Sequence, residues 1–364
     1  MKLALVFGTR PQIIKCVPVI RECIERKIDL VIVNTGQHYD FELSKIFFQG
    51  LDVPPPKYDL GIGSGSHSWQ TGNIMIAVEK ALREIKPSVC LVPGDTNSAI
   101  GAALAAVKLK ISVAHLESGL RSHEEFMPEE INRKAIDHIC QLLFAPTQNA
   151  KKNLLVEGIA KKKVVLSGDT MYDLYLRERE RIEGTGLPEG AIAGQYAVAT
   201  IHREENTDEP ERLGNILDAI KRCKTHVILP MHPRTRERLK QFNLINKAKS
   251  ITHLSMIDPL GYHAMMKLMQ NSLFVMTDSG GMQKEAFMVQ VPCITLRHST
   301  EWIDTVNAGA NFLVSRMGKD RISDIIGHVT KNRREIVRMI KKAKNPFGDG
   351  MAAPKVIEEI IKRF

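Results

Sequence analysis

Short runs of apolar residues, many of them β-branched, alternate with longer helix-length segments through most of the chain. In the first half, the runs lie at 3–7, 30–34, 88–92, 112–115, 142–145 and 164–166. In the second half, they lie at 196–201, 226–230, 251–254, 273–276 and 293–296. Runs that are apolar on both faces and separated by helices are typical of parallel strands in βα units. The two sets therefore predict an α/β protein with two doubly wound, Rossmann-like domains.

The length of 364 residues agrees with two domains, because one hydrophobic core rarely serves a chain of this size. We expect the domain break in 167–172 or in the Gly- and Pro-bearing stretch 184–194, and a final amphipathic helix over 354–364. No apolar run reaches the roughly 18–20 residues that are needed to cross a bilayer. The chain starts directly with a strand-like run instead of a signal peptide. These features predict a cytoplasmic protein with no membrane partner.

The net charge of +10 is compatible with binding to nucleic acid, an anionic membrane or an anionic small molecule. The basic residues form no long block, and aromatic residues make up only 5% of the chain, which argues against a stacking surface for nucleic acid. A diffuse potential that attracts a nucleotide fits better, although ordinary surface chemistry explains the charge equally well. The six cysteines lack the spacing of a zinc site or a disulfide framework, so we expect buried cysteines and no metal.

The residues after the first predicted strand suit an anion. Gly8 permits a tight turn, and Pro11 is suited to the first position of a helix. Arg10 and Lys15 would then lie near a helix N-terminus, where backbone N–H groups favour negative charge. The chain has neither a GxGxxG fingerprint after a strand nor a Walker loop, which argues against NAD and ATP, and we expect no cofactor. The glycine-rich segment 61–65 is expected to be a loop.

Three carboxylates stand out in the first half: Asp95 in PGDT, Glu117 in HLESGLR and Glu129 in PEEINR. Any one of them has an ordinary explanation as a helix cap or a surface ion pair. Three acids near the strand ends of one sheet are harder to explain in that way. General acid–base chemistry at carbon needs two such groups with separated pKa values, so the set predicts a proton-transfer site.

The second half carries a candidate phosphate loop. Segment 277–286 follows an apolar run and opens a helix with Ser279, Gly280 and Gly281. Serine and two glycines leave backbone N–H groups open to a pyrophosphate, although a plain structural turn is the alternative. Glu285 lies about one turn further on, where it could bind both ribose hydroxyls. Two histidine–arginine pairs also follow predicted strands and are interpreted as anion-binding groups: His202 with Arg203, and His232 with Arg234.

Together, these segments resemble the non-hydrolysing UDP-N-acetylglucosamine 2-epimerases. The similarity runs through nearly the whole chain in ordered motifs: GTRPxxIK at 8–15, TGQH at 35–38, GDT at 94–96, HxExGLRS at 115–122, PEEINR at 128–133, FAPT at 144–147, HREEN at 202–206 and TDSGG at 277–281. The resemblance implies a GT-B fold, with domains at 1–168 and 169–345, the active site in the interdomain cleft, and a C-terminal helix at 346–364 that returns to the first domain. It also implies a homodimer.

By motif position, the resemblance implies functions for individual residues. Catalytic roles fall to Asp95, Glu117, Glu129 and His202. Contacts with UDP or substrate fall to Arg10, Lys15, Arg133, His202, Ser279, Gly280, Gly281 and Glu285. Some bacterial members bind a second substrate molecule as an allosteric activator, and the positions used there correspond to Gln37, His38, Gln70 and His232.

The reaction that the resemblance implies is inversion of C2 of a UDP-2-acetamido sugar. One carboxylate removes H2 while the C1–O bond to UDP breaks, and UDP then adds back to the enzyme-bound glycal as a proton reaches the other face of C2. Groups that bind the pyrophosphate stabilise the departing charge. The route needs no redox cofactor, and its product is a precursor for surface polysaccharide or glycoprotein glycans.

The chain departs from the commonest family pattern at several positions. Gln12 replaces a frequent Glu, and the interval from Glu117 to Glu129 is shorter than in many bacterial relatives. Segment 300–306 reads TEWIDTV where a TERPE-like string is typical, and it resembles the branch acting on UDP-2,3-diacetamido-2,3-dideoxy-glucuronate. We therefore predict that substrate first and UDP-N-acetylglucosamine second. Gln12 would avoid repulsion of the C6 carboxylate, and Arg297 or His298 would supply a cation.

Three other functions share part of this pattern. A GT-B glycosyltransferase has the fold and the donor loop, but it needs an acceptor site and has no use for three acids in the first domain. A hydrolysing epimerase shares nearly every motif and releases free sugar and UDP. A non-catalytic UDP-sugar sensor would not need all three acids.

Overall fold

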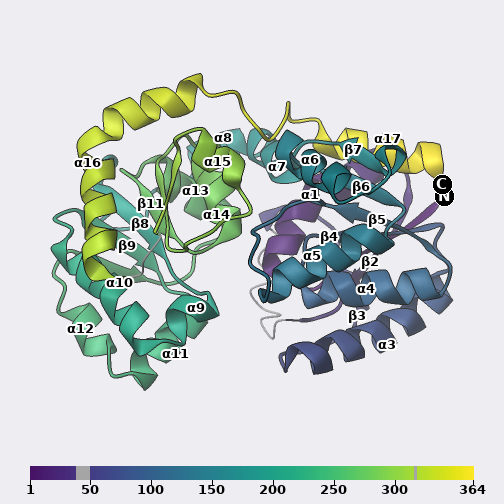
Figure 1. Ribbon diagram of the computed structural model, residues 1–364, viewed down its shortest axis with the longest axis horizontal. Coiled ribbons are helices and arrows are strands. Elements are labelled where there is room, and N and C mark those ends of the chain that lie inside the picture. The colour runs from purple at the N-terminus through teal and green to yellow at the C-terminus, as the bar shows by residue number, and fades with distance from the viewer. Residues whose placement is uncertain (38–49, 315–317) are drawn as a thin grey trace. The chain divides into compact units, whose positions relative to one another are not determined.

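The computed structural model describes residues 1–37, 50–314 and 318–364. The chain divides into two compact units (Figure 1). The first unit comprises Met1–Arg177 and Asn345–Phe364, and the second comprises Glu178–Lys344. Each unit is built on a parallel sheet, so the predicted α/β fold with two Rossmann-like domains is confirmed.

The sheet of the first unit has the order β3-β2-β1-β4-β5-β6-β7, and every pair is parallel. Its strands are β1 (Lys2–Phe7), β2 (Asp29–Asn34), β3 (Tyr58–Asp59), β4 (Val89–Pro93), β5 (Ser112–Leu116), β6 (Leu142–Ala145) and β7 (Val164–Leu166). The central strands are buried over almost their whole length, which explains why they lack polar alternation. Strand order reverses between β1 and β4, so their carboxyl ends form the switch point at which such sheets bind ligands.

Helices that follow the strands pack around this sheet. They are α1 (Arg10–Glu25), α3 (His67–Ile85), α4 (Asn97–Lys108), α5 (Pro128–Ile139), α6 (Gln148–Val156), α7 (Thr170–Arg177) and α17 (Ala352–Arg363), with a 3-10 turn η1 (Lys161–Lys163). Helices α3 and α4 lie close together, because a Cβ on Gly101 would come within 2.7 Å of Ile74 Cγ2. Helices α7 and α17 pack on α1, and the Ala353 N–H donates to the buried Asp173 over 2.7 Å. Residues beyond the predicted boundary at 168 therefore group with the first unit.

The sheet of the second unit has the order β10-β9-β8-β11-β12-β13, again wholly parallel. Its strands are β8 (Tyr196–Thr200), β9 (His226–Pro230), β10 (Leu254–Ile257), β11 (Val275–Thr277), β12 (Cys293–Thr295) and β13 (Asn311–Leu313). Its helices are α8 (Arg179–Gly184), α9 (Glu204–Thr207), α10 (Pro210–Arg222), α11 (Pro233–Gln241), α12 (Ile245–Lys249), α13 (Tyr262–Gln270), α14 (Gly280–Met288), α15 (Ile303–Asn307) and α16 (Lys319–Lys342). Here β8 and β11 flank the switch point.

The differences from the predicted elements lie at the sheet edges. The strand expected at 251–254 is wrong: Leu254 N–H donates to Ile251 O over 3.0 Å in a turn, and the strand begins at Leu254. This edge strand is half-buried throughout, so its apolar signal is weak. The short edge strands β3 and β13 were not predicted, for the same reason. All six cysteines are buried as predicted, and the described helices include none able to span a membrane.

Candidate active site

The turn after β1 is held by the buried side chain of Gln12. Its Oε1 accepts the N–H groups of Gly8 (2.9 Å) and Thr9 (3.2 Å), while its Nε2 donates to the Pro93 carbonyl at the end of β4 (2.7 Å). These bonds close a capping box on α1 and tie together the two strands of the switch point. Only 1% of Gln12 is exposed. The Gln12 amide, which was predicted to favour a substrate carboxylate, is therefore bonded within the protein instead.

Lys15 and Glu117 meet at the carboxyl ends of β1, β4 and β5. Lys15 Nζ forms an ion pair with Glu117 Oε2, and a Cβ on Gly94 would lie 3.2 Å from that Nζ. Gly94 has φ +65°, so a side chain would be both strained and crowded there. Glu117 itself has φ +67°, which costs on the order of 1–3 kcal/mol for a residue other than glycine. Such a conformation persists only where the surrounding structure holds the residue in place.

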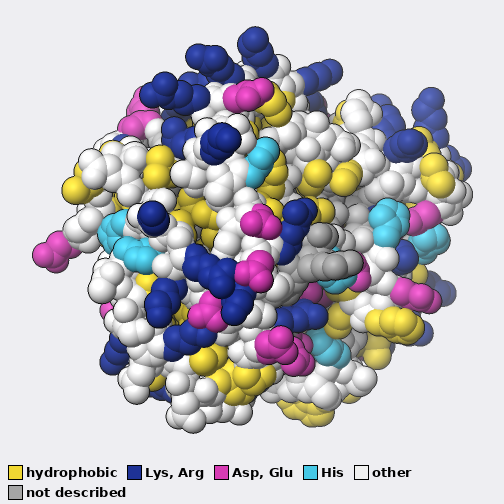
Figure 2. Space-filling view, turned by 60° about the vertical axis from the view of Figure 1, so that its left-hand side comes forward, with side chains coloured by type: hydrophobic (Ala, Val, Ile, Leu, Met, Phe, Trp, Pro, Cys, Tyr) yellow, Lys and Arg dark blue, Asp and Glu magenta, His cyan; other side chains and the backbone are white. Residues whose placement is uncertain are grey.

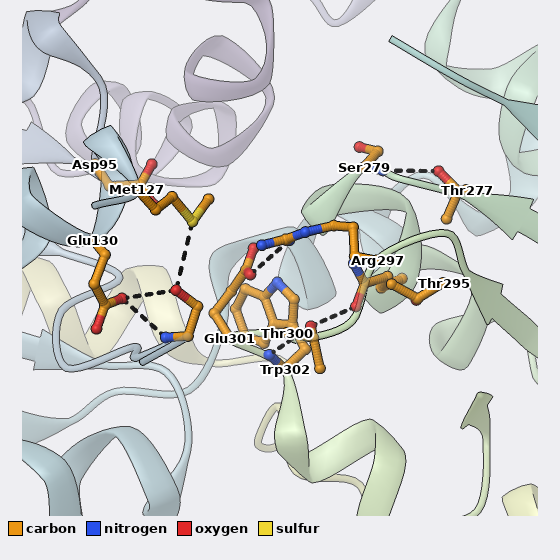
Figure 3. Close-up of polar contacts among 12 residues, drawn as sticks. Asp95, Met127, Glu130, Thr277, Ser279, Thr295, Arg297, Thr300, Glu301 and Trp302 are labelled. Carbon is orange, nitrogen blue, oxygen red and sulfur yellow. Dashed lines mark hydrogen bonds and ion pairs between the residues drawn. The ribbon is translucent and has the colours of Figure 1, made fainter. Parts of the chain in front are cut away.

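Asp95 is paired with Arg133, which also binds Glu130. The buried guanidinium of Arg133 contacts Asp95 Oδ2 and lies 2.9 Å from Glu130 Oε2. Glu130 also accepts the Ser122 N–H (2.9 Å) and hydroxyl (3.0 Å), as Figure 3 shows. Burial alone would raise the pKa of Glu130, but the Ser122 hydrogen bonds and the Arg133 charge outweigh it and lower the pKa. Glu130 was not predicted, although its i,i+3 spacing to Arg133 was visible in the sequence.

The three predicted acids differ in their accessibility. The Asp95 side chain is 25% exposed and that of Glu117 is 8% exposed. Glu129 is half-buried in the first turn of α5, next to Glu130. Arg10, at the start of α1, is also half-buried. The sheet edge of the first unit thus gathers carboxylates with basic partners, an arrangement suited to moving protons.

The predicted allosteric residues lie in two places. Gln70 Nε2 donates to Gly63 O (2.7 Å) and to Gln37 O (3.2 Å), and Gln70 Oε1 accepts from Asn97 Nδ2 (2.8 Å). Gln37 Oε1 accepts the Ser98 N–H over 3.0 Å, which brings both glutamines to the start of α4. His38 lies outside the described residues. His232 caps α11 in the second unit, and its ring centroid lies 5.2 Å from that of His202.

At the switch point of the second unit, buried Asp278 binds the turn after β8. It accepts the backbone N–H groups of His202 (3.0 Å) and Arg203 (3.0 Å), and the amide of Asn206 (3.1 Å). His202 Nδ1 lies 3.1 Å from Asp278 Oδ1, and the His202 side chain is 34% exposed. Burial would raise the pKa of Asp278, but the His202 charge and these hydrogen bonds lower it strongly. Asp278 was missed as a site residue although it lies inside the TDSGG motif.

The predicted phosphate loop opens α14 as expected. Ser279 is its N-cap and accepts from Met282 N over 3.5 Å, while Ser279 N–H donates to Thr277 Oγ1 over 3.0 Å (Figure 3). Gly280 begins the helix, where first-turn N–H groups have no partner within the helix. A Cβ on Gly280 would lie 2.3 Å from Glu301 Oε1, so a side chain there would require the Glu301 carboxylate to move. Glu285 is buried within the same helix.

Residues 300–302, the TEW string, pack beside this loop. Arg297 NH1 lies 3.0 Å from Glu301 Oε2 (Figure 3), and Arg297 Nε lies 3.2 Å from Glu205 Oε1. Lys284 lies over the Trp302 ring at 4.3 Å, a cation–π contact. Two carboxylates thus balance Arg297, whose side chain is 3% exposed, so the prediction that it supplies a cation to a substrate carboxylate is wrong. His298 is exposed.

The basic side chains on the surface are spread out, as a diffuse positive potential requires. Figure 2 shows Lys and Arg side chains at many places on one face, with Asp, Glu and His side chains between them. Among the described residues, no group of three or more His, Cys, Asp or Glu side chains could hold a metal ion.

Two parallel Rossmann-like sheets, with acids at one switch point and a helix-opening glycine loop at the other, are the parts of a GT-B-like fold. Residues 21–361 match the UDP-N-acetylglucosamine 2-epimerase family, and the chain belongs to that family. It is 44% identical to the UDP-N-acetylglucosamine 2-epimerase of Methanocaldococcus jannaschii over 98% of each chain. It is also 40% identical to the UDP-2,3-diacetamido-2,3-dideoxy-D-glucuronate 2-epimerase of Pseudomonas aeruginosa over 100% of each.

Solved structures agree with this assignment. The Methanocaldococcus jannaschii enzyme in complex with UDP-GlcNAc and UDP superposes with a TM-score of 0.91 at 43% identity, covering 100% of both chains. The UDP-GlcNAc 2-epimerase of Neisseria meningitidis bound to UDP-GlcNAc gives a TM-score of 0.89 at 30% identity, again over 100% of both. The predicted family and GT-B fold are thereby confirmed.

Proposed function

We propose that this protein inverts C2 of a UDP-2-acetamido sugar without releasing free sugar, by elimination and re-addition of UDP. The observation that carries the proposal is Glu117, a strained carboxylate held by Lys15 at the switch point where Asp95 also lies. Glu129 lies in the first turn of α5, the helix whose Arg133 binds Asp95. We assign removal and return of the C2 proton to Asp95, Glu117 and Glu129.

The second unit supports the nucleotide half of the proposal. We assign Ser279, Gly280 and Gly281 to the pyrophosphate, because first-turn N–H groups and the helix dipole favour an anion there. Glu285 would bind the ribose hydroxyls. We propose His202 as a further pyrophosphate contact, which stabilises UDP as it leaves. Arg10 and Lys15 would add positive charge in the first unit.

For the substrate, we propose UDP-N-acetylglucosamine first. Gln12 and Arg297, two of the three residues expected to favour an acidic sugar, are occupied by contacts within the protein, while the third, His298, is exposed. The relative named for UDP-N-acetylglucosamine is also the more similar of the two compared, at 44% against 40% identity. The diacetamido-glucuronate is the second candidate, because the TEW string resembles that branch. A comparison of kcat/KM for the two UDP-sugars decides between them.

The experiment that tests the proposed reaction is incubation with UDP-N-acetylglucosamine alone, followed by ¹H and ³¹P NMR. We expect a second UDP-sugar, epimeric at C2, while the total of UDP-sugar stays constant. Turnover that begins only when an acceptor is added would favour a glycosyltransferase. Accumulation of free sugar and UDP in step with consumption would favour a hydrolysing epimerase.

We propose, further, that the enzyme is a cytoplasmic homodimer, and that Gln37, His38, Gln70 and His232 bind a second substrate molecule. These proposals rest on the resemblance alone. Sedimentation equilibrium tests the dimer, and a sigmoidal dependence of rate on substrate concentration tests the activation.

A further inference from the structure

His115 lies fully buried on β5, two residues before Glu117. Its Nε2 lies 2.8 Å from the Gly94 carbonyl oxygen, and its Nδ1 lies 2.7 Å from Asp137 Oδ1. A carbonyl oxygen and an ionised carboxylate can only accept hydrogen bonds. Both ring nitrogens of His115 therefore face acceptors, and the buried ring links the Gly94 carbonyl to the Asp137 carboxylate.

Asp137 is the second half of this pair, and it lies near the end of α5. Its Oδ2 accepts the Gly119 N–H over 3.1 Å and lies 2.8 Å from Arg121 NH1. Burial would raise the pKa of Asp137, but the bonds and charges of His115 and Arg121 outweigh it and lower the pKa. Both oxygens of the Asp137 carboxylate are thus bonded within the first unit.

The pair connects the three elements that carry the proposed acids. Gly94 directly precedes Asp95 in the turn after β4. His115 and Gly119 flank Glu117 on both sides. Asp137 lies on α5, the helix that carries Glu129 in its first turn.

We propose that His115 and Asp137 are positioning residues, which hold the three acids at the mutual distances that proton transfer at C2 needs. The inference rests on the proposed function and adds two residues to it. The strained Glu117 makes the role necessary: a left-handed carboxylate relaxes unless its neighbours are held, and here both neighbouring segments are bonded to one buried pair. A displacement of about 1 Å at a catalytic group can cost on the order of 10²-fold in rate.

The test compares variants of the pair. His115→Phe keeps a ring of similar size but removes both donors, and we expect kcat to fall on the order of 10²-fold with little change in KM. Asp137→Leu should have a similar effect. Asp137→Asn should rescue most of the rate, because its amide can donate to Nδ1 of a neutral His115 whose Nε2–H still binds Gly94. A merely structural role would not produce this split between kcat and KM.

The matched control is Asp173→Leu. Asp173 is a buried carboxylate of the same unit that accepts the Ala353 N–H, and it touches none of the proposed acids in the contacts described. It should lower the melting temperature about as much as Asp137→Leu while leaving kcat near the wild-type value. A single cooperative melting transition verifies that each variant is folded. If His115→Phe does not fold, His115→Gln must show the same loss of kcat.

Two results would overturn the proposal: a wild-type kcat in folded His115 variants, or an equal loss of kcat in Asp173→Leu. Failure of the wild-type protein to invert C2 would instead contradict the proposed function, so the two failures are distinguishable.

Discussion

The two switch points have the same topology and opposite chemistry. In the first unit, the carboxyl ends of β1, β4 and β5 carry Asp95 and Glu117, each with its own cation. In the second unit, Asp278 follows β11, and its carboxylate is bonded to neighbouring N–H groups and lies beside the His202 ring. What faces outward there is a histidine and a glycine-bearing helix start.

The difference teaches that a doubly wound sheet decides where a site forms, while side chains decide what it does. Accessible carboxylates with positive partners suit proton transfer. A helix start suits an anion, because its first-turn N–H groups and the helix dipole favour negative charge. Substitutions in each unit should separate these two functions, and they are given from the largest expected effect to the smallest.

The largest effect should come from the acids of the first unit. Asp95→Asn, Glu117→Gln and Glu129→Gln should each lower kcat by on the order of 10²–10⁴-fold, because each removes a proton-transfer group. Affinity for UDP, measured by calorimetry, should stay close to wild type. Glu79→Gln, on the exposed face of α3, is the control and should be fully active. Near-normal turnover in all three variants would remove the proposed acid–base set.

Asp278→Asn should act on stability first. Loss of the carboxylate that binds His202 should cost about 3 kcal/mol in free energy of unfolding at pH 7. Because the pKa of Asp278 is lowered in the folded state, its contribution is present above the unfolded value of about 4 and is lost as pH falls below it. Thermal unfolding should therefore show a gap between wild type and variant that shrinks as the pH falls below about 4. A gap that widens as the pH falls below about 4 would contradict this.

Gly280→Ala should weaken UDP binding. The new Cβ would lie 2.3 Å from Glu301 Oε1, so the Glu301 side chain or the loop must shift, at a cost of about 1–3 kcal/mol. KM and the Kd for UDP should both rise. The control is Gly261→Ala, at the N-cap of α13, where a Cβ meets no atom within 4 Å. Equal effects of both substitutions would show that crowding at the loop is not the cause.

Gln12→Glu should have the smallest effect on kcat/KM, and the effect should be the same for both candidate UDP-sugars. A carboxylate can still accept the Gly8 and Thr9 N–H groups, but it cannot donate to Pro93 O, which leaves a buried acceptor unsatisfied at about 1 kcal/mol. The variant should therefore lose kcat/KM equally for both candidate UDP-sugars. A loss confined to the acidic sugar would instead support direct contact between Gln12 and its carboxylate.

Much of this architecture could be predicted from the sequence, because central parallel strands are apolar on both faces and end in short polar motifs. The turn at Gly8–Thr9, the helix start at Pro128 and the loop at Ser279 all follow from local residue preferences. The edge strand at Leu254–Ile257 was misplaced because exposure weakens its pattern. Gln12 and Arg297 were misread because their partners, Pro93 O and Glu205, lie far away along the chain, and local sequence cannot reveal such contacts.

The central claim is that C2 loses and regains a proton at the acids of the first unit while UDP stays within the enzyme. NMR of UDP-N-acetylglucosamine turned over in D₂O, without added NAD or metal, tests it most directly. The product should carry deuterium at C2, and the total of UDP-sugar should remain constant. An epimerised product that keeps its original hydrogen at C2 would contradict the elimination route.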